Sequence, residues 1–287
     1  GAPFDKKMYT PTFEGITLDP IYTPASVEGL QDCHTFPGAQ DYLRGTKSAH
    51  GANLWEIAQG IDVRCPVEAG KLTAQELAKG ATAIHPVLDY ATTHGKDTPA
   101  CECRGVSIAT LTHISKFFES ADPTKHELHM AVGASAVPML GLIEAWARKT
   151  GASLADIKGC VGADPIAALA RDGKLSRSLK SLYDEMAQTI LRMQAKNSSL
   201  RTILIRGSVY GNAGASAVQE AAASLAEAIA VIRAMAERGI APEETAKRIR
   251  FEVTVGANFF MEIARIRAMR VLWAHVAQAF GVQGAGT

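Results

Sequence analysis

The feature that most constrains this chain is a regular alternation of short β-branched runs and amphipathic segments, which begins near Thr73. That order is typical of βα units, in which helices connect neighbouring strands of a parallel sheet. The β-branched runs predict six strands, at residues 82–88, 106–109, 127–132, 157–161, 202–208 and 249–255. The segments with helical spacing predict five helices, at residues 110–119, 137–150, 176–196, 215–238 and 258–280.

Two of these helices carry the clearest apolar stripes. In the helix at 215–238 the stripe recurs at helical spacing, and Gly239 is expected to end the helix. In the helix at 258–280, Arg270 interrupts the stripe, so we expect its charged group to reach a carboxylate or water. The stripe residues are Val218, Leu225, Ile229 and Ile232 in the first helix, and Phe259, Ile263, Ile266, Trp273, Ala277 and Phe280 in the second.

Six βα units leave two architectures open. A (β/α)8 barrel of the TIM type needs eight units, and its strands pair all the way round only when the barrel closes. An open six-stranded sheet is the competing architecture. Periodicity cannot separate them, because both alternate strand with helix.

The first 72 residues differ in texture from the rest and hold six of the 12 prolines. Scattered apolar runs and frequent turn residues predict an irregular arm over residues 1–72 that wraps around something else. The barrel is expected over residues 73–287, incomplete at its C-terminus. The sequence begins with Gly1 rather than Met, so we expect it to have been cut from a longer chain.

The composition places the chain among ordinary globular proteins. It is 47% hydrophobic and 21% charged, which excludes disorder, collagen-like repeats and a disulfide-dense miniature. A net charge of +1 gives no argument for binding nucleic acid or an anionic membrane, and no run approaches the roughly 18 apolar residues of a membrane span. Five cysteines fit a reducing cytoplasm. Cys101, Cys103 and Cys33-His34 suggest ordinary thiols rather than a zinc site.

Several motifs, in matching order along the chain, resemble those of one enzyme family. Residues 258–273 read N-F-F-M-E-I-A-R-I-R-A-M-R-V-L-W, residues 212–220 read N-A-G-A-S-A-V-Q-E, and residues 89–97 read D-Y-A-T-T-H-G-K-D. Nearer the start come P-G at 37–38, R-G at 44–45 and W-E-I-A-Q at 55–59. In this order they resemble the methylmalonyl-CoA mutase family over the length of the chain.

The resemblance implies a substrate-threaded (β/α)8 barrel set against a cobalamin-binding domain of flavodoxin-like fold. Adenosylcobalamin supplies the radical chemistry in that family, while the barrel excludes water and orients the acyl-CoA. This chain lacks the D-x-H-x-x-G motif of the cobalt-ligating histidine, and its eight histidines are dispersed. We therefore expect the cobalamin domain to be absent and the chain to carry no cofactor-binding residues and no metal ligands.

Three positions depart from the pattern of catalytic members of the family. Where those members have G-Y-H in the fifth unit, with a histidine that hydrogen-bonds the thioester, this chain has Val209, which has no donor. At the fourth strand, T-I-Q-N-D is replaced by C-V-G-A-D, which keeps only Asp164. In the arm, Gly51 replaces a tyrosine and His50 lies beside it. This combination resembles the non-catalytic small (beta) subunit of heterodimeric methylmalonyl-CoA mutase, so we expect no catalytic residues.

Considered singly, the polar residues near predicted strand ends favour structural roles. We expect His85 to be a hydrogen-bonded structural residue and Asp89 to cap the loop or helix that follows. Asp164 and Pro165 predict the start of a helix. His94 also lies near the end of the first predicted strand, the end at which barrels place their active sites.

The remaining basic candidates also favour plain interpretations. Arg265, Arg267 and Arg270 are expected to pair with Glu262 and solvent rather than to hold CoA phosphates. The predicted strand at 127–132 has a histidine just before it and another within it, at positions 126 and 129, and both are expected to be exposed or packed.

The preferred function is a structural subunit paired with a homologous catalytic large subunit as a heterodimer. Together they would interconvert methylmalonyl-CoA and succinyl-CoA, with adenosylcobalamin and the acyl-CoA on the partner. The alternatives are a catalytic acyl-CoA mutase barrel whose cobalamin domain lies on a separate chain, and an unrelated barrel enzyme for a small metabolite. Polar groups projecting into an open barrel would favour the enzymes, whereas an apolar plug would favour the subunit.

Overall fold

The computed structural model describes residues 3–30, 35–39, 42–46, 48, 55–97 and 104–282. The six strands of its main sheet are β3 (Ala58–Ile61), β4 (Ala83–Pro86), β5 (Glu127–Gly133), β6 (Gly159–Ala163), β7 (Arg201–Arg206) and β8 (Ile249–Glu252). The helices that accompany them are α2 (Pro66–Ala78), α3 (Tyr90–His94), α4 (Leu111–Phe118), α5 (Ala136–Thr150), α6 (Pro165–Asp172), α7 (Leu179–Ala195), α8 (Ser208–Asn212), α9 (Ala217–Ala236), α10 (Pro242–Arg248) and α11 (Phe259–Ala279). Ahead of the sheet lie α1 (Phe4–Met8), the antiparallel pair β1 (Thr10–Pro11) and β2 (Thr17–Leu18), and a short 3-10 helix (Pro24–Val27), while a second 3-10 helix (Leu154–Asp156) precedes β6.

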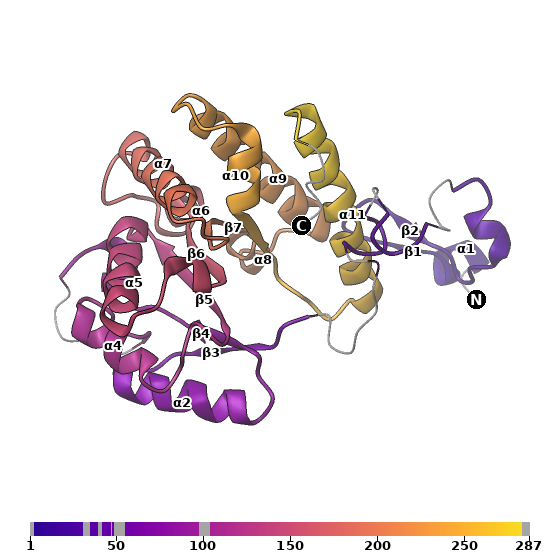
Figure 1. The fold of residues 1–287 in the computed structure, drawn as a ribbon. Helices are drawn as coiled ribbons and strands as arrows, with labels where there is room; N and C mark the ends of the chain where they lie inside the picture. Colours follow the sequence, from indigo (N-terminus) through magenta and orange to yellow (C-terminus); the bar gives the residue numbers. More distant parts are fainter. Residues whose placement is uncertain are drawn as a thin grey trace.

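The order of the strands decides between the two architectures. Each strand from β4 to β8 pairs in parallel with the strand that precedes it in the chain. An open doubly wound sheet would instead reverse its strand order at a switch point. Because parallel crossovers are right-handed, a sheet that never reverses carries its connecting helices on one face, and Figure 1 shows α2, α4, α5 and α7 following one another outside the strands. This is the wall of a (β/α)8-type barrel, with six strands in it, and the predicted fold class is confirmed.

Most of the predicted elements are confirmed in place. The five predicted helices correspond to α4, α5, α7, α9 and α11, and the strands predicted at 82–88, 127–132, 157–161, 202–208 and 249–255 correspond to β4 to β8. Gly239, expected to end α9, has a positive φ of 77° just beyond it. The left-handed conformation is one that glycine adopts without steric cost.

The predicted strand at 106–109 is wrong. Val106 forms only an isolated parallel bridge with Leu88, and the segment continues as a loop into α4. Both edges of β4 are already occupied by β3 and β5, so this apolar run finds no free strand edge beside it. Ile108 is instead buried in the core as part of a loop.

One strand was not predicted at all. β3 lies inside the segment expected to be an irregular arm, and it forms the first strand of the sheet. Its sequence, Ala-Gln-Gly-Ile, has neither a β-branched run nor an alternating pattern, so propensity gave no signal. The strand that we took as first is therefore the second, and α2 runs across the expected boundary between residues 72 and 73. The division into an arm and a barrel stays a prediction.

The core lies between the outer face of the sheet and the helices. In β5 the burial alternates, with Leu128, Met130 and Val132 fully buried and the residues between them less so. This period of two is expected of a strand whose two faces have different surroundings. The largest fully buried side chains in the core include Phe117, Ile84, Ile114, Met139, Ile143 and Ile190.

The apolar stripe predicted for α11 is buried only toward its C-terminal end. Trp273 and Ala277 are buried, whereas Phe259 is 68% exposed and Ile263 is 39% exposed. Arg270 lies partly buried in the same helix, where burial and the neighbouring Arg267 lower its pKa. The first half of α11 therefore presents apolar surface that the described residues leave uncovered.

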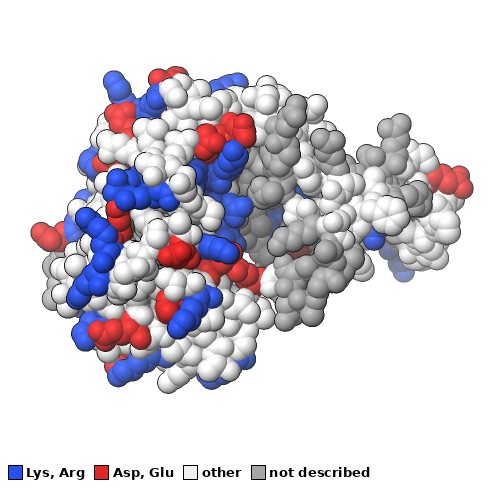
Figure 2. All heavy atoms as spheres, viewed as in Figure 1, with Lys and Arg blue, Asp and Glu red and all other residues white. Residues whose placement is uncertain are grey.

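The surface carries both signs of charge. Figure 2 shows lysine and arginine side chains interspersed with aspartate and glutamate over the helical face, as expected from a net charge of +1. Among the described residues, no helix combines the length and the apolar character that crossing a membrane requires.

Two helical glycines allow a matched test of the packing. A Cβ on Gly70 of α2 would lie 2.5 Å from the carbonyl oxygen of Phe117 in α4, whereas a Cβ on Gly141 of α5 would meet nothing within 4 Å. We expect Gly141→Ala to stabilise the fold by up to about 1 kcal/mol, because alanine favours a helix over glycine by about that amount. Gly70→Ala should destabilise it by about 1–3 kcal/mol, because overpacking outweighs the same propensity gain. Urea unfolding measures both, and equal effects would contradict the packing of α2 on α4.

Candidate functional site

The inner face of the sheet carries polar and charged side chains. In β5, Glu127 and His129 alternate with the buried residues that pack under the helices, so they lie on the opposite face. The same alternation places His85 of β4 beside the outward Ile84, and Arg250 and Glu252 of β8 after the outward Ile249. On β4, β5 and β8 the inner face is therefore polar and charged, while β6 and β7 place the buried Cys160 and Leu204 there, between core residues that face the helices.

A cavity of about 760 Å³ lies at the carboxyl ends of the strands. Barrel enzymes build their active sites at this end from the segments that follow each strand. We therefore take it as the candidate functional site. The titratable side chains that line it are Asp62, His85, Tyr90, Arg104, Arg171, Asp172, Arg206 and Glu252.

Most charges around this cavity are paired with one another. Arg206 Nε lies 3.4 Å from Glu252 Oε1, and the hydroxyl of Ser208 donates to the same carboxylate oxygen. Arg171 Nε donates to Asp172 Oδ1 at 2.8 Å, and this pairing holds the pKa of Asp172 at about 2. Of the three arginines in the wall, only Arg104 has no hydrogen-bond or ion-pair partner among the described residues.

The two histidines expected near the barrel mouth make hydrogen bonds there. His85 Nδ1 lies 3.0 Å from the carbonyl oxygen of His129, which ties β4 to β5 and agrees with the structural role predicted for His85. His94 is buried at the end of α3, stacks on Tyr90 with ring centroids 3.7 Å apart, and places Nε2 2.9 Å from Asp172 Oδ2. The contact between His94 and Asp172 joins α3 to α6 across the mouth.

The predicted caps are confirmed. Asp89 accepts a hydrogen bond from the backbone N–H of Thr92 at 2.7 Å and begins α3. Asp164 accepts from the N–H of Ala167 at 2.7 Å, and Pro165 is the first residue of α6. These side chains satisfy N–H groups that the first turn of a helix leaves without intrahelical acceptors.

A second charged cluster lies at the amino ends of the strands. His129 Nε2 lies 3.1 Å from Glu56 Oε2 and 3.7 Å from Glu127 Oε2, while Arg250 Nη1 lies 3.0 Å from His129 Nδ1. Burial and Arg250 lower the pKa of His129 to about 4, so the ring is neutral at pH 7. His129 thus takes part in a half-buried network, whereas His126 is half-buried with its Nδ1 3.3 Å from the carbonyl oxygen of Thr82.

The ligand atoms of Glu56, Glu127 and His129 all lie within 4.8 Å of one another, close enough for one metal ion. A metal on Nε2 would require the proton of the neutral imidazole to move to Nδ1. That nitrogen faces the guanidinium of Arg250, which is itself a donor with no acceptor capacity. The cluster therefore fits an ion-pair network and does not fit a metal site.

The segment after β7 contains Val209, the position at which the resemblance leads us to expect a histidine in catalytic chains. Residues 208–212 form the short helix α8, so Val209 and Tyr210 directly follow the strand end at which Arg206 lines the cavity. The side chain of Val209 has only methyl groups and no donor, whereas the hydroxyl of its neighbour Ser208 donates to Glu252. Val209 offers no hydrogen bond to a ligand.

The three arginines of α11 have different surroundings. Arg265 is buried and pairs with Glu220 and Glu262, as predicted for Glu262. Arg267 Nε donates to the carbonyl oxygen of Leu43 at 3.2 Å. With Arg44 and Arg270 it lines a cavity of about 360 Å³ that has no acidic side chain among its described lining residues. The solvent-facing role expected for Arg267 and Arg270 stays a prediction.

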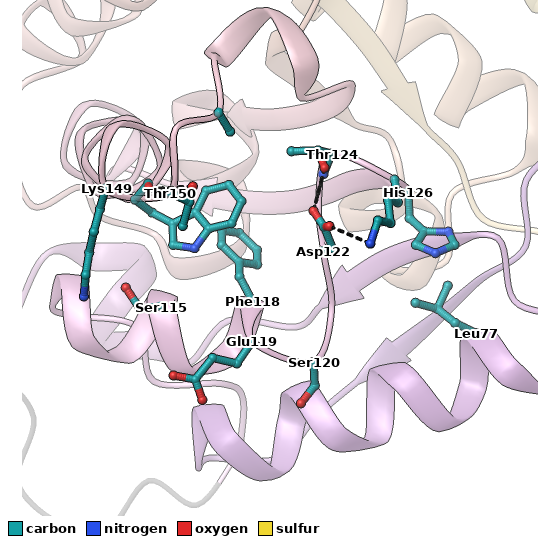
Figure 3. A pocket seen from close by; sticks show the side chains of 13 residues that line it. Leu77, Ser115, Phe118, Glu119, Ser120, Asp122, Thr124, His126, Lys149 and Thr150 are labelled. Atoms are coloured by element: carbon teal, nitrogen blue, oxygen red, sulfur yellow. Dashed lines mark hydrogen bonds and ion pairs between the residues drawn. The ribbon is translucent and has the colours of Figure 1, made fainter.

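Another cavity, of about 680 Å³, lies outside the barrel between α4, α5 and the segment that precedes β5. Figure 3 shows Phe118 in its wall and Asp122 bonded to Thr124. Trp146 also lines it, and Asp122 forms an ion pair with Lys125. The two aromatic rings lie 4.9 Å apart between centroids. This cavity lies away from the carboxyl ends of the strands, and its described lining residues do not form a catalytic or metal-binding arrangement.

The methylmalonyl-CoA mutase family model matches residues 11–286 of this chain. The chain belongs to that family. An unrelated barrel enzyme is thereby excluded. Similar proteins include the methylmalonyl-CoA mutase large subunit of Streptomyces virginiae, 30% identical over 285 residues, which cover 96% of this chain and 38% of that protein. The methylmalonyl-CoA mutase of Escherichia coli (strain K12) is 27% identical over 95% of this chain and 39% of its own length. The methylmalonyl-CoA mutase large subunit of Porphyromonas gingivalis is 28% identical over 95% of this chain and 39% of its own length.

The chain thus spans about two-fifths of the length of these curated relatives. Members of the family depend on adenosylcobalamin. Two of the three relatives are named as large subunits, and such a name implies a second subunit in those proteins. The assignment of this chain as a small subunit stays a prediction.

Several residues considered in the sequence lie outside the described part of the chain. They are Cys33, His34, His50, Gly51, Cys101 and Cys103. The described cysteines are free thiols, with Cys65 exposed and Cys160 buried. Burial raises the pKa of the Cys160 thiol to about 12, so it is not a reactive thiolate.

Sequence reasoning missed the residues that form the cavity wall. Arg206 and Glu252 end β7 and β8, and Arg171 and Asp172 end α6. A usable signal was present for the first two, because charged residues in predicted strands should face the barrel interior. Arg171 and Asp172 end α6, whose start was predicted at Asp164 and Pro165 but whose end was not, so their place at the mouth had no sequence signal.

The His129 network gives a direct test. We expect the His129 ring to titrate near pH 4 in NMR, because burial and Arg250 both disfavour the imidazolium. Arg250→Gln should raise this midpoint but leave it below 6.5, since burial is the larger cause. Arg201→Gln should raise it less, because Arg201 is the weakest of the charges acting on the ring. A midpoint near 6.5 in the unaltered protein would contradict the network.

Proposed function

We propose that this chain is a structural, non-catalytic subunit of an adenosylcobalamin-dependent methylmalonyl-CoA mutase. A homologous large subunit would carry out the interconversion of methylmalonyl-CoA and succinyl-CoA. The observation that carries the proposal is Val209 on α8, at the strand end where catalytic relatives place a thioester donor. Stabilising a developing oxyanion requires donors aimed at it, and valine has none.

The charge pairing around the cavity supports this role. Glu252 receives both Arg206 and Ser208, and Asp172 receives both Arg171 and His94. Groups held in such pairs stabilise the wall of the barrel, and a ligand would have to break the pairs to use them. The wall is therefore suited to holding its own shape.

The described residues also fit poorly with a cobalt cofactor on this chain. Adenosylcobalamin supplies the radical chemistry of the family when it is bound. The histidines at the barrel mouth are engaged, because His85 contacts the backbone of β5 and His94 contacts Asp172. We place the cofactor on the partner chain.

The exposed N-terminal segment supports the proposal that this chain binds a protein partner. It projects away from the sheet, as Figure 1 shows for α1, β1 and β2. Its large apolar side chains are exposed, with Phe13 fully so, and exposed apolar surface of this extent marks interaction sites. The other exposed apolar residues of the segment include Phe4, Ile21, Tyr22, Leu30 and Phe36. We propose that this arm contacts the homologous large subunit in a cytoplasmic heterodimer.

A specific observation favours a second candidate, a catalytic acyl-CoA mutase barrel whose cobalamin domain lies on another chain. The inner face of the barrel is polar, which is the feature expected of the enzymes. In addition, Arg44, Arg267 and Arg270 line a cavity without an acidic residue among the described ones, which suits the phosphates of a CoA. Binding of CoA separates the two candidates.

The non-catalytic proposal predicts no turnover by the isolated chain. We expect no succinyl-CoA from methylmalonyl-CoA and no stoichiometric adenosylcobalamin after incubation and gel filtration. Val209→His should not rescue activity, because one donor contributes about 3–4 kcal/mol and the cofactor would still be missing. Product formation by the unaltered chain, quantified by chromatography, would overturn the proposal.

For CoA itself we expect no saturable binding to the isolated chain in calorimetry. The second candidate predicts the opposite, with binding weakened about ten- to a hundredfold by Arg267→Gln or Arg270→Gln, since a hydrogen bond to a charged group contributes about 1.5–3 kcal/mol. Arg233→Gln, on an exposed position of α9, is the matched control. Binding that the α11 variants weaken and the control does not would favour the enzyme.

A further inference from the structure

Two acidic side chains that play no part in the proposed function meet beneath α8. Asp164, at the end of β6, is 3% exposed, and Glu227, in α9, is 4% exposed. The two carboxyl groups lie close enough for a hydrogen bond between them. Two ionised carboxylates in such a place would repel strongly, so a direct hydrogen bond between them requires a proton.

The surrounding donors show which group is ionised. One carboxylate oxygen of Asp164 accepts from the backbone N–H of Ala167 at 2.7 Å, and the other accepts from the backbone N–H of Arg206 at 2.7 Å. Both oxygens are thus used as acceptors, which is the arrangement that stabilises a charged carboxylate. The position of these N–H groups is fixed by β7 and by the first turn of α6.

Glu227 has the complementary arrangement. Its Oε2 accepts from the Tyr210 hydroxyl at 3.2 Å, whereas its Oε1 is buried and receives no donor from any described residue. An ionised oxygen in that position would lose its hydration without compensation. A proton on Oε1, donated to Asp164, satisfies the oxygen and the pair together.

We propose that Asp164 and Glu227 share one proton, which resides on Glu227, and that the pair is a pH-sensitive latch holding α8 against α9 and the end of β6. Tyr210 is the contact from α8 to the latch. α8 packs closely on α9 at this point, since a Cβ on Gly207 would lie 2.4 Å from Ser224 Oγ. The inference concerns the fold around α8 and holds whether or not the chain is catalytic.

The groups around the pair come from several elements. Burial and Asp164 raise the pKa of Glu227 to about 10, against 4.5 for an ordinary glutamate. Burial also raises the pKa of Asp164, although Glu227, the backbone donors and Arg206 act in the opposite direction. Burial and the two acids also raise the pKa of Tyr183 to about 12 and that of Tyr210 further. The titratable and charged groups that face the pair are Arg171 of α6, Tyr183 of α7, Arg206 of β7 and Tyr210 of α8, and Arg238 after α9 lies over the Tyr183 ring.

The sign of the pH effect follows from these positions. Between about pH 4.5 and 10 the folded chain keeps a proton on Glu227 that the unfolded chain has lost. The folding equilibrium therefore falls by roughly tenfold per pH unit from this group alone. The latch is strongest in acid and is lost as the pH rises toward 10.

The experiment compares the full chain with Glu227→Gln, whose amide keeps a donor toward Asp164 but cannot ionise. We expect the folding equilibrium of this variant to gain on that of the unaltered chain with each pH unit between 5 and 9, by up to about tenfold per unit, in urea unfolding series. Glu243→Gln, in an exposed ion pair of α10, should show no such trend. A difference between Glu227→Gln and the unaltered chain that is constant with pH would overturn the proposal.

Two measurements on the unaltered chain keep the proposal testable if the variant does not fold. Infrared spectroscopy should show a protonated carboxyl group at pH 8, where ordinary acids are ionised, and its absence would overturn the shared proton. Hydrogen exchange, corrected for its intrinsic pH dependence, should show the amides of residues 208–212 losing protection toward pH 10 more than those of α10. Equal losses in the two helices would overturn the latch.

Discussion

The rest of the structure depends on parallel strands that follow one another in chain order. Because each strand is added beside its predecessor, every right-handed crossover returns on the same side, and the helices cover one face only. In the described part of the chain, no connecting helix covers the inner face of the sheet. Its side chains must find partners among themselves, or among whatever completes the barrel.

This constraint explains why the inner charges form pairs. The side chains on the inner face are partly removed from water, so arginines and acids there are more stable when they are paired. Arg206 with Glu252, and Arg250 with Glu127 and His129, meet this requirement across neighbouring or more distant strands. An enzyme cavity has to leave such groups free for its ligand, and a structural barrel does not.

The helices were predictable because their signal is local. α9 and α11 repeat apolar residues at helical spacing, and Asp89, Asp164 and Gly239 mark helix ends through bonds to close neighbours. Strands were less predictable because a strand requires a free edge. The apolar run at 106–109 pairs with the chain just beyond β4 only through Val106, whereas the weak sequence of β3 pairs with β4 along its whole length.

By itself the sequence indicated the family, through motifs in order over the chain, and it placed Val209, whose side chain has no donor, where the resemblance expects a histidine. It also determined that Asp164 caps a helix, since that bond reaches only three residues along the chain. Only the tertiary structure decided that the carboxyl group of Asp164 meets that of Glu227, and that Asp172 meets His94 across the barrel mouth. Caps and periodicity are set by neighbours in the sequence, whereas partners from distant elements are chosen only when the curved sheet brings them together.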